Sequence, residues 1–470
     1  MVATGERIHV IGIAGSGAAG ATLLLHRAGA RVDGCDADPR SPYTPPLIEA
    51  GIGVLHGHHP SHLAGVDRLA ISPALRAVPG HPELQAAEAA GIAVVTWQAL
   101  MGELMAAPGR IGIGVTGTHG KSTTTALLGY LLEVAGLDPT VEVGAFIDAW
   151  GASVRSGGGA PFVVEADEFG DNFLNYHPAA AVVTNVEMDH PDYFADASAV
   201  MDSFERFVRG MAAEPTLGGR LLVIAADDAG AGELTARLRD WDGRIVRYGA
   251  GGAVEATGIE LDRAGTSFFL FDRRWRMSLA GAHNVGNATA ALVVARELGA
   301  ELDPLTEGLR TFAGAGRRME LIADTPRVTI YDDYGHHPTE VRAALAAARQ
   351  RIGTDRRLWA ILEPHMYSRT ALLLEEFSTA FADANEVVIA DIFASRDTPE
   401  AMASTSADAL ADAIERASGI PALATGDVDS TTDYVAEHIG EGDAVLVMGA
   451  GKSYRIARGL AERLTGDTAS

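Results

Sequence analysis

The sequence is short of cysteine and of long apolar stretches. Among its 470 residues the one cysteine is Cys35, which excludes an intrachain disulfide and is typical of proteins in a reducing cytosol. No apolar run approaches the ~18 residues that a membrane-spanning helix needs. No positively charged, apolar leader precedes the first expected strand, Arg7–Ile13. We therefore expect a cytoplasmic protein that does not bind membranes.

Positive charge is also scarce. The formal net charge is −25, so a nucleic acid or an anionic membrane surface would be repelled overall, and we expect neither as a partner. Hydrophobic residues make up 47% of the chain and charged residues 21%, which is typical of a globular protein with ample core. At typical domain sizes of ~100–200 residues, the length predicts about three domains.

Lysine is the rarest cation. Only Lys121 and Lys452 occur, and every other member of the Lys+Arg count is arginine. Lys121 stands in the run GTHGKST at 117–123. Its compact ammonium can reach nucleotide phosphates, while the glycines let backbone N–H groups approach the phosphate oxygens. The Ser122 hydroxyl is the group that such loops place on Mg²⁺.

This run also has the expected surroundings of a phosphate loop. Arg110–Thr116 is expected to form a buried strand and Thr123–Val134 a helix, so the run joins a strand to a helix. It is shorter than the Walker form, because Val115 stands where the first glycine would be. The run predicts a nucleoside triphosphate site; the alternative is a glycine-rich turn with a surface lysine.

A second glycine motif opens the chain. Gly15, Gly17 and Gly20 form G-x-G-x-x-G after the first strand, and Asp36 follows the next expected strand, Arg31–Cys35. This arrangement predicts a site for a nucleotide's phosphates and ribose, and taken alone it would indicate NAD. The alternative is a glycine turn that only lets the helix pack on the strand. Further expected elements are strands Arg68–Ser72 and Ile92–Val95 and a helix over Pro82–Ala90.

The rest of the chain continues the alternation of strands and helices. Breaks at 107–109 and at 314–316 divide it into segments 1–107, 108–314 and 315–470, all of α/β type. The expected later strands are Pro161–Glu165, Ala179–Asn185, Leu221–Ala225, Val328–Tyr331, Leu358–Leu362, Glu386–Ile392 and Ala444–Met448. The expected helices lie over Ala288–Leu298, from Thr339, through Phe377 and at the end of the chain.

Acidic residues follow two of the expected central strands. EADE at 165–168 follows one, and NVEMDH at 185–190 follows the other. Because the carboxyl ends of parallel strands share an edge with the phosphate loop, Ser122, Glu165 and His190 can converge on one or two Mg²⁺ ions. The alternative is that these residues form salt bridges or cap helices.

Three further sets of polar residues follow. The pattern alone leaves two interpretations for the first two sets. Asn284 and Asn287 precede the helix expected from Ala288 and either cap it or bind an adenine edge. Arg317 and Arg318 are either phosphate ligands or surface arginines. The runs DDYGHHP at 332–338 and EPHMYSR at 363–369 follow adjacent strands and predict a second polar pocket, for substrate rather than metal.

The order and spacing of these motifs resemble the Mur ligase family of peptidoglycan synthesis, over nearly the whole chain. The resemblance rests on the runs IGIAGSG at 11–17, GTHGKST at 117–123, EADE at 165–168, TNVEMDH at 184–190, HNVGN at 283–287 and DDYGHHPTEV at 332–341. The last run is most like the alanine-adding branch. No lysine is available for the carbamylated role that several other branches use, which indicates the same branch.

The resemblance implies an ATP- and Mg²⁺-dependent ligase. It would join L-alanine to the lactoyl carboxylate of UDP-N-acetylmuramate through an acyl phosphate, and act as a monomer or a homodimer. The fold implied is an N-terminal Rossmann-like UDP-binding domain (1–107), a central P-loop ATPase-type parallel sheet (108–314) and a C-terminal Rossmann-like amino-acid-binding domain (315–470).

The resemblance also implies roles for individual residues. Catalysis would involve Lys121, His119, His190 and Glu165, and Mg²⁺ would be held by Ser122, Glu165 and His190. ATP would be bound by Gly117, Thr118, Gly120, Lys121, Ser122, Thr123, Asn284, Asn287, Arg318 and Asp333. The UDP-sugar would be bound by Gly15, Ser16, Gly17, Asp36, Ser72 and His119, and the amino acid by Tyr334, His336, His365 and Arg369.

The sequence departs from the family pattern at three places. Met366 replaces an arginine, which leaves Arg369 alone for the amino-acid carboxylate if the lost arginine binds it. Lys452 stands where aspartate is usual, and we favour a surface position for it. Val143-Gly144-Ala145 replaces an expected Asn-Gly-Gly. The alternatives are a muramyl ligase for another amino acid or a recycled peptide, an NAD-dependent oxidoreductase, and a catalytically silent nucleotide-binding regulator.

Overall fold

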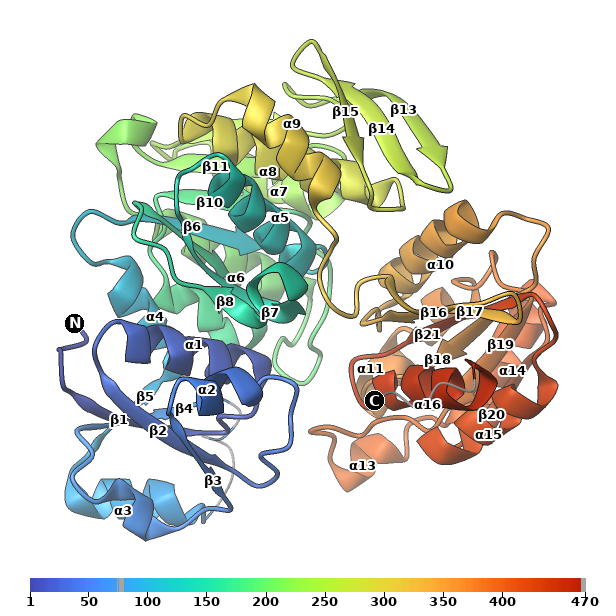
Figure 1. Ribbon diagram of the computed structural model, residues 1–470, viewed down its shortest axis with the longest axis horizontal. Coiled ribbons are helices and arrows are strands. Elements are labelled where there is room, and N and C mark those ends of the chain that lie inside the picture. Colours follow the sequence, from blue (N-terminus) through green and yellow to red (C-terminus); the bar gives the residue numbers. More distant parts are fainter. Residues whose placement is uncertain (74, 76–79, 466–470) are drawn as a thin grey trace. The chain divides into compact units, whose positions relative to one another are not determined.

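The computed structural model describes residues 1–73, 75 and 80–465 (Figure 1). The chain forms two compact units, which are described separately. The first contains Met1–Met188, Ala197–Ala256 and Gly286–Ala315, and the second contains Asp189–Asp196, Thr257–Val285 and the chain from Gly316 onward. No helix in the described part of the chain is both long enough and apolar enough to cross a membrane.

The N-terminal part of the first unit is a five-stranded parallel sheet of order β3-β2-β1-β4-β5. This is the order of a doubly wound nucleotide-binding fold, so the predicted Rossmann-like domain is confirmed. Its strands are β1 (Arg7–Ile11), β2 (Arg31–Asp36), β3 (Gly53–His56), β4 (Arg68–Ile71) and β5 (Ala93–Thr96). Its helices are α1 (Ser16–Arg27), α2 (Pro45–Glu49), η1 (Pro60–Leu63), α3 (Pro82–Ala90) and α4 (Trp97–Met105).

The first strand ends earlier than predicted. It stops at Ile11 and not at Ile13, because Gly12 has a φ of +79° and turns the chain. The N–H groups of Gly12 and Ile13 then donate to Cys35 O over 2.8 and 3.2 Å. The turn delivers Gly15 to the N-cap of α1. The glycine motif therefore lies at the carboxyl end of β1, where doubly wound sheets bind nucleotides.

Two glycines of this motif are required by packing. A Cβ on Gly17 would lie 2.6 Å from Trp97 Cζ2, and a Cβ on Gly20 would lie 2.7 Å from Val154 Cγ1. Helix α1 thus packs closely on α4 and on β8 (Ala152–Arg155) of the central sheet. Gly17 and Gly20 are therefore explained by packing, as one of the two interpretations of the motif expected. The turn around Gly15 stays the candidate for phosphate binding.

The central part of the first unit is a seven-stranded sheet of order β12-β11-β10-β6-β9-β7-β8, in which only β8 runs antiparallel to its neighbour. The predicted parallel sheet is confirmed. Its other strands are β6 (Ile111–Thr116), β7 (Thr140–Ile147), β9 (Pro161–Glu165), β10 (Ala180–Val183), β11 (Leu221–Ala225) and β12 (Arg244–Tyr248). Its helices include α5 (Lys121–Val134), α6 (Ala197–Arg209), α7 (Ala229–Arg237), α8 (His283–Glu297) and α9 (Leu302–Thr311).

The second unit contains a six-stranded sheet of order β16-β17-β21-β18-β19-β20, in which only β16 is antiparallel. Apolar side chains cover both of its faces. The strands are β16 (Glu320–Asp324), β17 (Val328–Asp333), β18 (Leu358–Leu362), β19 (Glu386–Ala390), β20 (Ala422–Gly426) and β21 (Asp443–Met448). The helices are α10 (Pro338–Ile352), α11 (Tyr367–Leu372), α12 (Leu374–Ser378), α13 (Pro399–Met402), α14 (Ala407–Ser418), α15 (Val428–His438) and α16 (Tyr454–Thr465).

A small antiparallel sheet also belongs to the second unit. It consists of β13 (Thr257–Asp262), β14 (Gly265–Leu270) and β15 (Arg273–Met277), none of which was predicted. Gln350 on α10 donates through Nε2 to Gly265 O over 2.8 Å and joins this sheet to the larger one. The chain thus crosses between the two units within the segment predicted as one central domain.

Three predicted helices differ from those observed. The helix expected over Thr123–Val134 begins at Lys121. Helix α8 begins at His283 and not at Ala288, so Asn284 and Asn287 lie inside it rather than before it. Asn284 does not cap the helix: its Nδ2 donates to Ala280 O over 2.7 Å. The helix predicted through Phe377 is divided into α11 and α12 at Leu373.

Candidate active site

The run at 117–123 forms a tight turn between β6 and α5. Gly117 has a φ of +132° and Gly120 a φ of +80°, which favour glycine. A Cβ on Gly117 would lie 2.1 Å from Thr184 Oγ1, and one on Gly120 would lie 2.8 Å from Asn287 Oδ1. Gly120 is the N-cap of α5 and has no side chain that could accept its first N–H groups. The helix therefore presents backbone donors to an anion.

Lys121 lies beside this turn and is paired with an acid. Its Nζ is 2.9 Å from Glu168 Oε2 and donates to Gly117 O over 2.7 Å. Burial alone would lower the pKa of Lys121, but the nearby charges of Glu168, Asp167 and Glu165 outweigh burial and raise it. The ammonium therefore stays charged, as binding of phosphate requires.

Ser122 and Glu165 meet at the next position. The Ser122 hydroxyl donates to Glu165 Oε1 over 2.9 Å, and Gly144 N donates to Glu165 Oε2 over 2.7 Å. A Cβ on Gly144 would lie 2.9 Å from Glu165 Oε1, so the strand approaches the carboxylate closely. A hydroxyl and a carboxylate oxygen side by side suit Mg²⁺. His190 lies in the second unit, and its part in the metal set stays a prediction.

The polar run after β10 supports the phosphate loop. His119 N donates to Asn185 Oδ1 over 2.8 Å, and Glu187 N donates to Thr118 Oγ1 over 2.8 Å. His119 Nε2 lies 3.5 Å from Glu187 Oε2, which orients the imidazole expected to face the sugar substrate. Asn185 and Glu187 thus position the loop and its histidine. From the sequence alone, this role could not be told apart from metal binding.

Glu142 is an acid that the sequence analysis missed. It lies on β7 with 1% of its surface exposed. Burial, followed by the charges of Glu165 and Asp167, raises the pKa of Glu142 well above its ordinary value. A neutral carboxyl group therefore lies behind the candidate magnesium ligands. An acid within the apolar run 140–147 was the available signal, but no strand was predicted there.

Apart from His119, which lies in the phosphate loop of the central sheet, the residues expected to bind the UDP-sugar lie at one edge of the N-terminal sheet. Gly15 and Ser16 begin α1, and Gly17 follows them. Asp36 ends β2 and accepts from Ala14 N through Oδ2 over 3.2 Å. Ser72 follows β4, which lies between β1 and β5 in the sheet. These positions agree with a ligand at the strand carboxyl ends, and the individual roles stay predictions.

Arg369 lies at the centre of a buried polar cluster in the second unit. Only 2% of its surface is exposed, and its Nε forms an ion pair with Asp189 Oδ1 at 2.8 Å. Its Nη2 lies 3.2 Å from His190 Nδ1, and its Nη1 lies 3.3 Å from His365 Nδ1. Burial would raise the pKa of Asp189, but the charges of His190 and Arg369 hold it well below its usual value.

The two predicted pocket histidines are neutral. Burial, together with the nearby Arg369 charge, lowers the pKa of His336 to about 4. Burial, then the charges of His336 and Arg369, lowers the pKa of His365 to about 2. Their rings lie 5.5 Å apart, and the Tyr334 ring lies edge-on to His336 at 5.6 Å. The structure thus places Tyr334, His336 and His365 in one cluster with Arg369.

Met366 stands where the family pattern has an arginine. It has a φ of +71°, is fully buried, and donates its N–H to Phe393 O over 2.9 Å. Arg396 was missed by the sequence analysis: its Nη2 lies 3.9 Å from Met366 Sδ, and its Nε pairs with Asp192 at 2.9 Å. A second guanidinium therefore lies next to the position of the lost arginine.

Arg317 and Arg318 have different tasks. Arg317 is tied within the second unit, since its Nε contacts Asp332 Oδ2 at 2.9 Å and its Nη2 donates to Gly449 O over 2.7 Å. Arg318 lies 3.7 Å from Glu340 Oε1, and its predicted phosphate contact stays a prediction.

The remaining predicted ATP residues and Lys452 also have defined positions. Asp333 accepts from Met319 N over 2.8 Å and from Gly335 N over 2.7 Å, and burial raises its pKa. Thr123 is buried in the first turn of α5. Lys452 is exposed, so the surface interpretation is correct.

Family models match three successive parts of the chain. The Mur ligase family catalytic domain matches residues 7–108, the Mur ligase middle domain matches 115–295, and the Mur ligase glutamate ligase domain matches 317–451. The UDP-N-acetylmuramate–L-alanine ligase of Kineococcus radiotolerans is 39% identical over 95% of this chain and 93% of its own length. The enzyme of that name from Mycolicibacterium vanbaalenii is 38% identical over 95% of this chain and 94% of its own.

Solved structures show the same fold. The UDP-N-acetylmuramate-alanine ligase of Thermotoga maritima is 24% identical, with a TM-score of 0.81 over 98% of this chain and 99% of that chain. A murein peptide ligase of Psychrobacter arcticus is 25% identical, with a TM-score of 0.70 over 99% of this chain and 100% of that chain. With its α/β sheets, its three matched domains and relatives of this identity along nearly its whole length, the chain belongs to the Mur ligase family.

Proposed function

We propose that this protein joins L-alanine to the lactoyl carboxylate of UDP-N-acetylmuramate at the expense of ATP, as a step in peptidoglycan precursor synthesis. One observation carries the proposal: three relatives that bear this name are 39, 38 and 37% identical over 93, 94 and 96% of their own lengths. In this reaction the carboxylate takes the γ-phosphoryl group and ADP leaves. The alanine amine then attacks the acyl carbon, and phosphate leaves.

The phosphate loop suits the first of these steps. A carboxylate that approaches the γ-phosphate brings anions together, so cationic groups must offset the repulsion. Lys121 stays charged and lies beside the helix N-terminus of α5. Ser122 and Glu165 would hold Mg²⁺, which when bound supplies further positive charge to the phosphate oxygens. An NAD-dependent oxidoreductase would leave Lys121, Ser122 and Glu165 without a role.

The side chains around Arg369 are the candidates for recognition of the amino acid. A guanidinium binds a carboxylate bidentately, and neutral imidazoles beside it do not compete as cations. His336 and His365 are such imidazoles. Asp189 already pairs with Arg369, so the charge left for an incoming carboxylate is reduced. Nε, Nη1 and Nη2 of Arg369 all have partners, so an amino-acid carboxylate would have to displace one of them to bind.

Phosphate release tests the proposal directly. The full-length protein is supplied with ATP, Mg²⁺ and UDP-N-acetylmuramate, and with L-alanine, glycine, L-serine or a tripeptide in separate reactions. We expect phosphate release and a product mass that corresponds to the addition of L-alanine. The assay is repeated without UDP-N-acetylmuramate, to exclude idle ATP hydrolysis.

The other outcomes separate the alternatives. Turnover with the tripeptide alone would favour a murein peptide ligase, for which the Psychrobacter arcticus structure gives a precedent in fold. No phosphate release with any acceptor would refute the ligase proposal, provided that circular dichroism shows the protein to be folded and that it binds ATP. The cytoplasmic location, the domain boundaries and the monomeric or homodimeric state stay predictions, and the last is checked by light scattering.

A further inference from the structure

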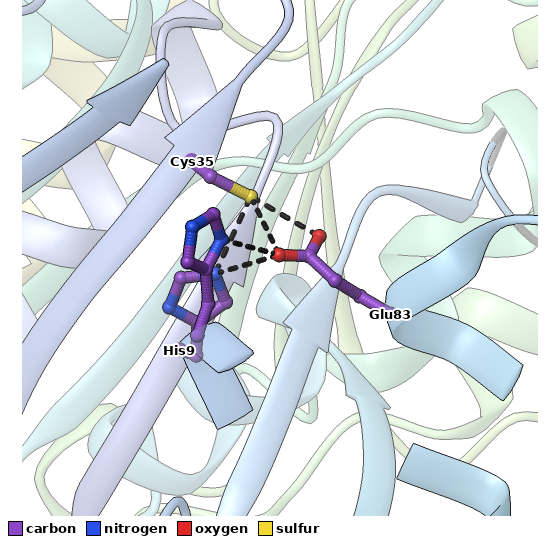
Figure 2. A group of neighbouring side chains, drawn as sticks. His9, Cys35 and Glu83 are labelled. Atoms are coloured by element: carbon purple, nitrogen blue, oxygen red, sulfur yellow. Dashed lines mark hydrogen bonds and ion pairs between the residues drawn. The ribbon is translucent and has the colours of Figure 1, made fainter. Parts of the chain in front are cut away.

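A cluster of buried metal-binding side chains lies in the N-terminal domain, apart from the phosphate loop. His9 comes from β1, Cys35 from β2 and Glu83 from α3, and all three are fully buried. Figure 2 shows the three side chains directed toward one another. His62 of η1 completes a group of four whose ligand atoms lie within 4.8 Å of one another.

The separations among His9, Cys35 and Glu83 match those between ligands of one ion. Cys35 Sγ lies 3.3 Å from His9 Nε2 and 3.2 Å from Glu83 Oε2, and His9 Nε2 lies 3.6 Å from Glu83 Oε1. Tetrahedral zinc with bonds of ~2.0–2.3 Å separates its ligand atoms by about 3.3–3.7 Å. His62 Nδ1 lies closer, at 2.7 Å from Glu83 Oε1, and would separate from it on binding.

The histidine on β1 is oriented as a metal ligand. His9 Nδ1 lies 2.5 Å from Asp33 Oδ1, on the side of the ring away from the sulfur. A carboxylate at one ring nitrogen holds the proton there and leaves the other nitrogen free to bind an ion. Nε2 is the nitrogen that faces Cys35 and Glu83. This relay of carboxylate, imidazole and ligand site is a common feature of zinc centres.

A second group of histidines lies beside the first. His81 has 7% of its surface exposed, and neither of its ring nitrogens has a hydrogen-bond partner among the described residues. It forms a second candidate group with His58 and Glu83. His58 Nδ1 lies 3.2 Å from Cys35 Sγ, so the two groups share one polar region. Buried polar atoms without partners are costly and are usually satisfied by protein, water or an ion.

We propose that the N-terminal domain binds one Zn²⁺ ion through His9 Nε2, Cys35 Sγ, His62 Nδ1 and the Glu83 carboxylate, with His58 and His81 beside it. Thiolate and imidazole ligands favour zinc over Mg²⁺, and four protein ligands are typical of a structural site rather than a catalytic one. This site is separate from the oxygen ligands Ser122 and Glu165, and the inference goes beyond the proposed ligase activity.

The consequence of binding is local order beneath the first glycine motif. Cys35 O accepts from Gly12 N and Ile13 N, and Asp36 comes directly after Cys35. An ion on the Cys35 sulfur would tie β1, β2, η1 and α3 together under this turn. Because a structural metal stabilises the folded state that holds it, the domain should unfold at a higher temperature with zinc than without.

Metal content of the full-length protein is the first test. Protein is purified under reducing conditions from zinc-supplemented medium, dialysed against metal-free buffer, and analysed by plasma mass spectrometry. We expect close to one equivalent of zinc per chain, and loss of most of it in Cys35→Ser. Since Cys35→Ser can fail to fold, His62→Gln serves as a second variant at a partly exposed ligand. His56→Gln, at an exposed histidine of β3, is the matched control and should keep its zinc.

Cobalt substitution identifies the ligands without reference to activity. Protein stripped of metal is titrated with Co²⁺, and we expect a sulfur-to-cobalt charge-transfer band that saturates at one equivalent and is absent from Cys35→Ser. The oxygen ligands proposed for Mg²⁺ cannot produce this band. Wild-type protein that is folded, retains no zinc and shows no such band would overturn the proposal, whether or not it is a ligase. Zinc bound equally by wild type and Cys35→Ser would overturn it as well.

Discussion

At the residue scale, the two lysines are opposites in environment. Lys121 is 13% exposed and lies 2.9 Å from Glu168, whereas Lys452 is exposed on the second unit. Glu168 is itself buried, so loss of the ammonium would leave a buried carboxylate without its cation. The same side chain therefore serves stability and, under the proposed function, phosphate binding.

We predict that Lys121→Ala lowers kcat by about 10²–10³-fold, the usual loss when one stabilising charge is removed from a transition state. Lys121→Arg keeps the charge but should also lose activity, because the larger planar guanidinium does not replace a compact ammonium. Phosphate release measures the effect. Lys452→Ala is the matched control and should retain wild-type rates. A fully active Lys121→Arg would contradict the prediction.

Glu142 gives the folded state a defined pH dependence. Its pKa lies well above the ordinary value of 4.5 because of burial and the neighbouring acids. Below pH 4.5 both the folded and the unfolded states are protonated, and the group has no effect. Above pH 4.5 the unfolded state loses its proton while the folded state keeps it. The free energy of unfolding therefore falls with rising pH, by at most about 1.4 kcal/mol per pH unit.

We predict that Glu142→Gln weakens this loss of stability, since the amide has the same shape and does not ionise. The difference in free energy of unfolding between variant and wild type should grow in favour of the variant from pH 5 toward pH 8. Urea denaturation at several pH values measures it, with Glu437→Gln at an exposed position of α15 as the control. Parallel pH profiles for Glu142→Gln and wild type would refute the prediction.

At the element scale, the phosphate loop depends on the backbone of two glycines. Gly117 combines a φ of +132° with a close approach to Thr184 Oγ1, so a side chain there must displace the start of α5 or the end of β10. Either displacement moves the N–H groups that would bind phosphate. Gly136, after the other end of α5, has a φ of +76° but no atom within 4 Å of a Cβ.

We predict that Gly117→Ala weakens ATP binding by at least about tenfold and destabilises the fold by about 1–3 kcal/mol, the cost of a strained backbone residue. Gly136→Ala carries similar backbone strain without the collision, so it should lose stability but keep ATP affinity. Calorimetric titration with ATP and chemical denaturation separate the two effects. Equal ATP affinity in both variants would show that the loop tolerates a side chain.

Elements with a buried, apolar run were predicted well, and elements defined by long-range pairing were not. Strands β9, β11 and β18 have the predicted bounds. All of their residues are apolar except Glu165, the last residue of β9. Strand β13 is exposed along its length and pairs with β14. Its apolar alternation is limited to Ile259 and Leu261, which is too short to predict a strand without its partner.

At the scale of the whole molecule, the net charge of −25 acts on stability. Like charges repel in the compact state, and salt screens them: the Debye length falls from about 30 Å at about 0.01 M to about 8 Å at about 0.15 M. The isoelectric point is near 4.9, so the repulsion shrinks as the pH approaches that value.

We predict that raising NaCl from about 0.01 M to about 0.15 M increases the thermal midpoint of unfolding at pH 8, and increases it less at pH 5.5. The protein should also pass unretained through a phosphocellulose column, because the resin carries the same sign of charge. Differential scanning calorimetry in matched buffers gives the midpoints. A salt effect of equal size at both pH values would mean that specific ion binding, and not screening, is responsible.

The sequence by itself determined the α/β class, the glycine loop around Lys121 and the family. Each of these depends on neighbouring residues, such as an apolar run that ends in a glycine or an acid. Only the tertiary structure decided which polar groups meet. It paired Glu168 with Lys121, buried Glu142 behind Glu165, and assembled His9, Cys35 and Glu83 from three distant segments. Such contacts depend on strand order and on burial, and neither is encoded in the spacing of residues along one chain.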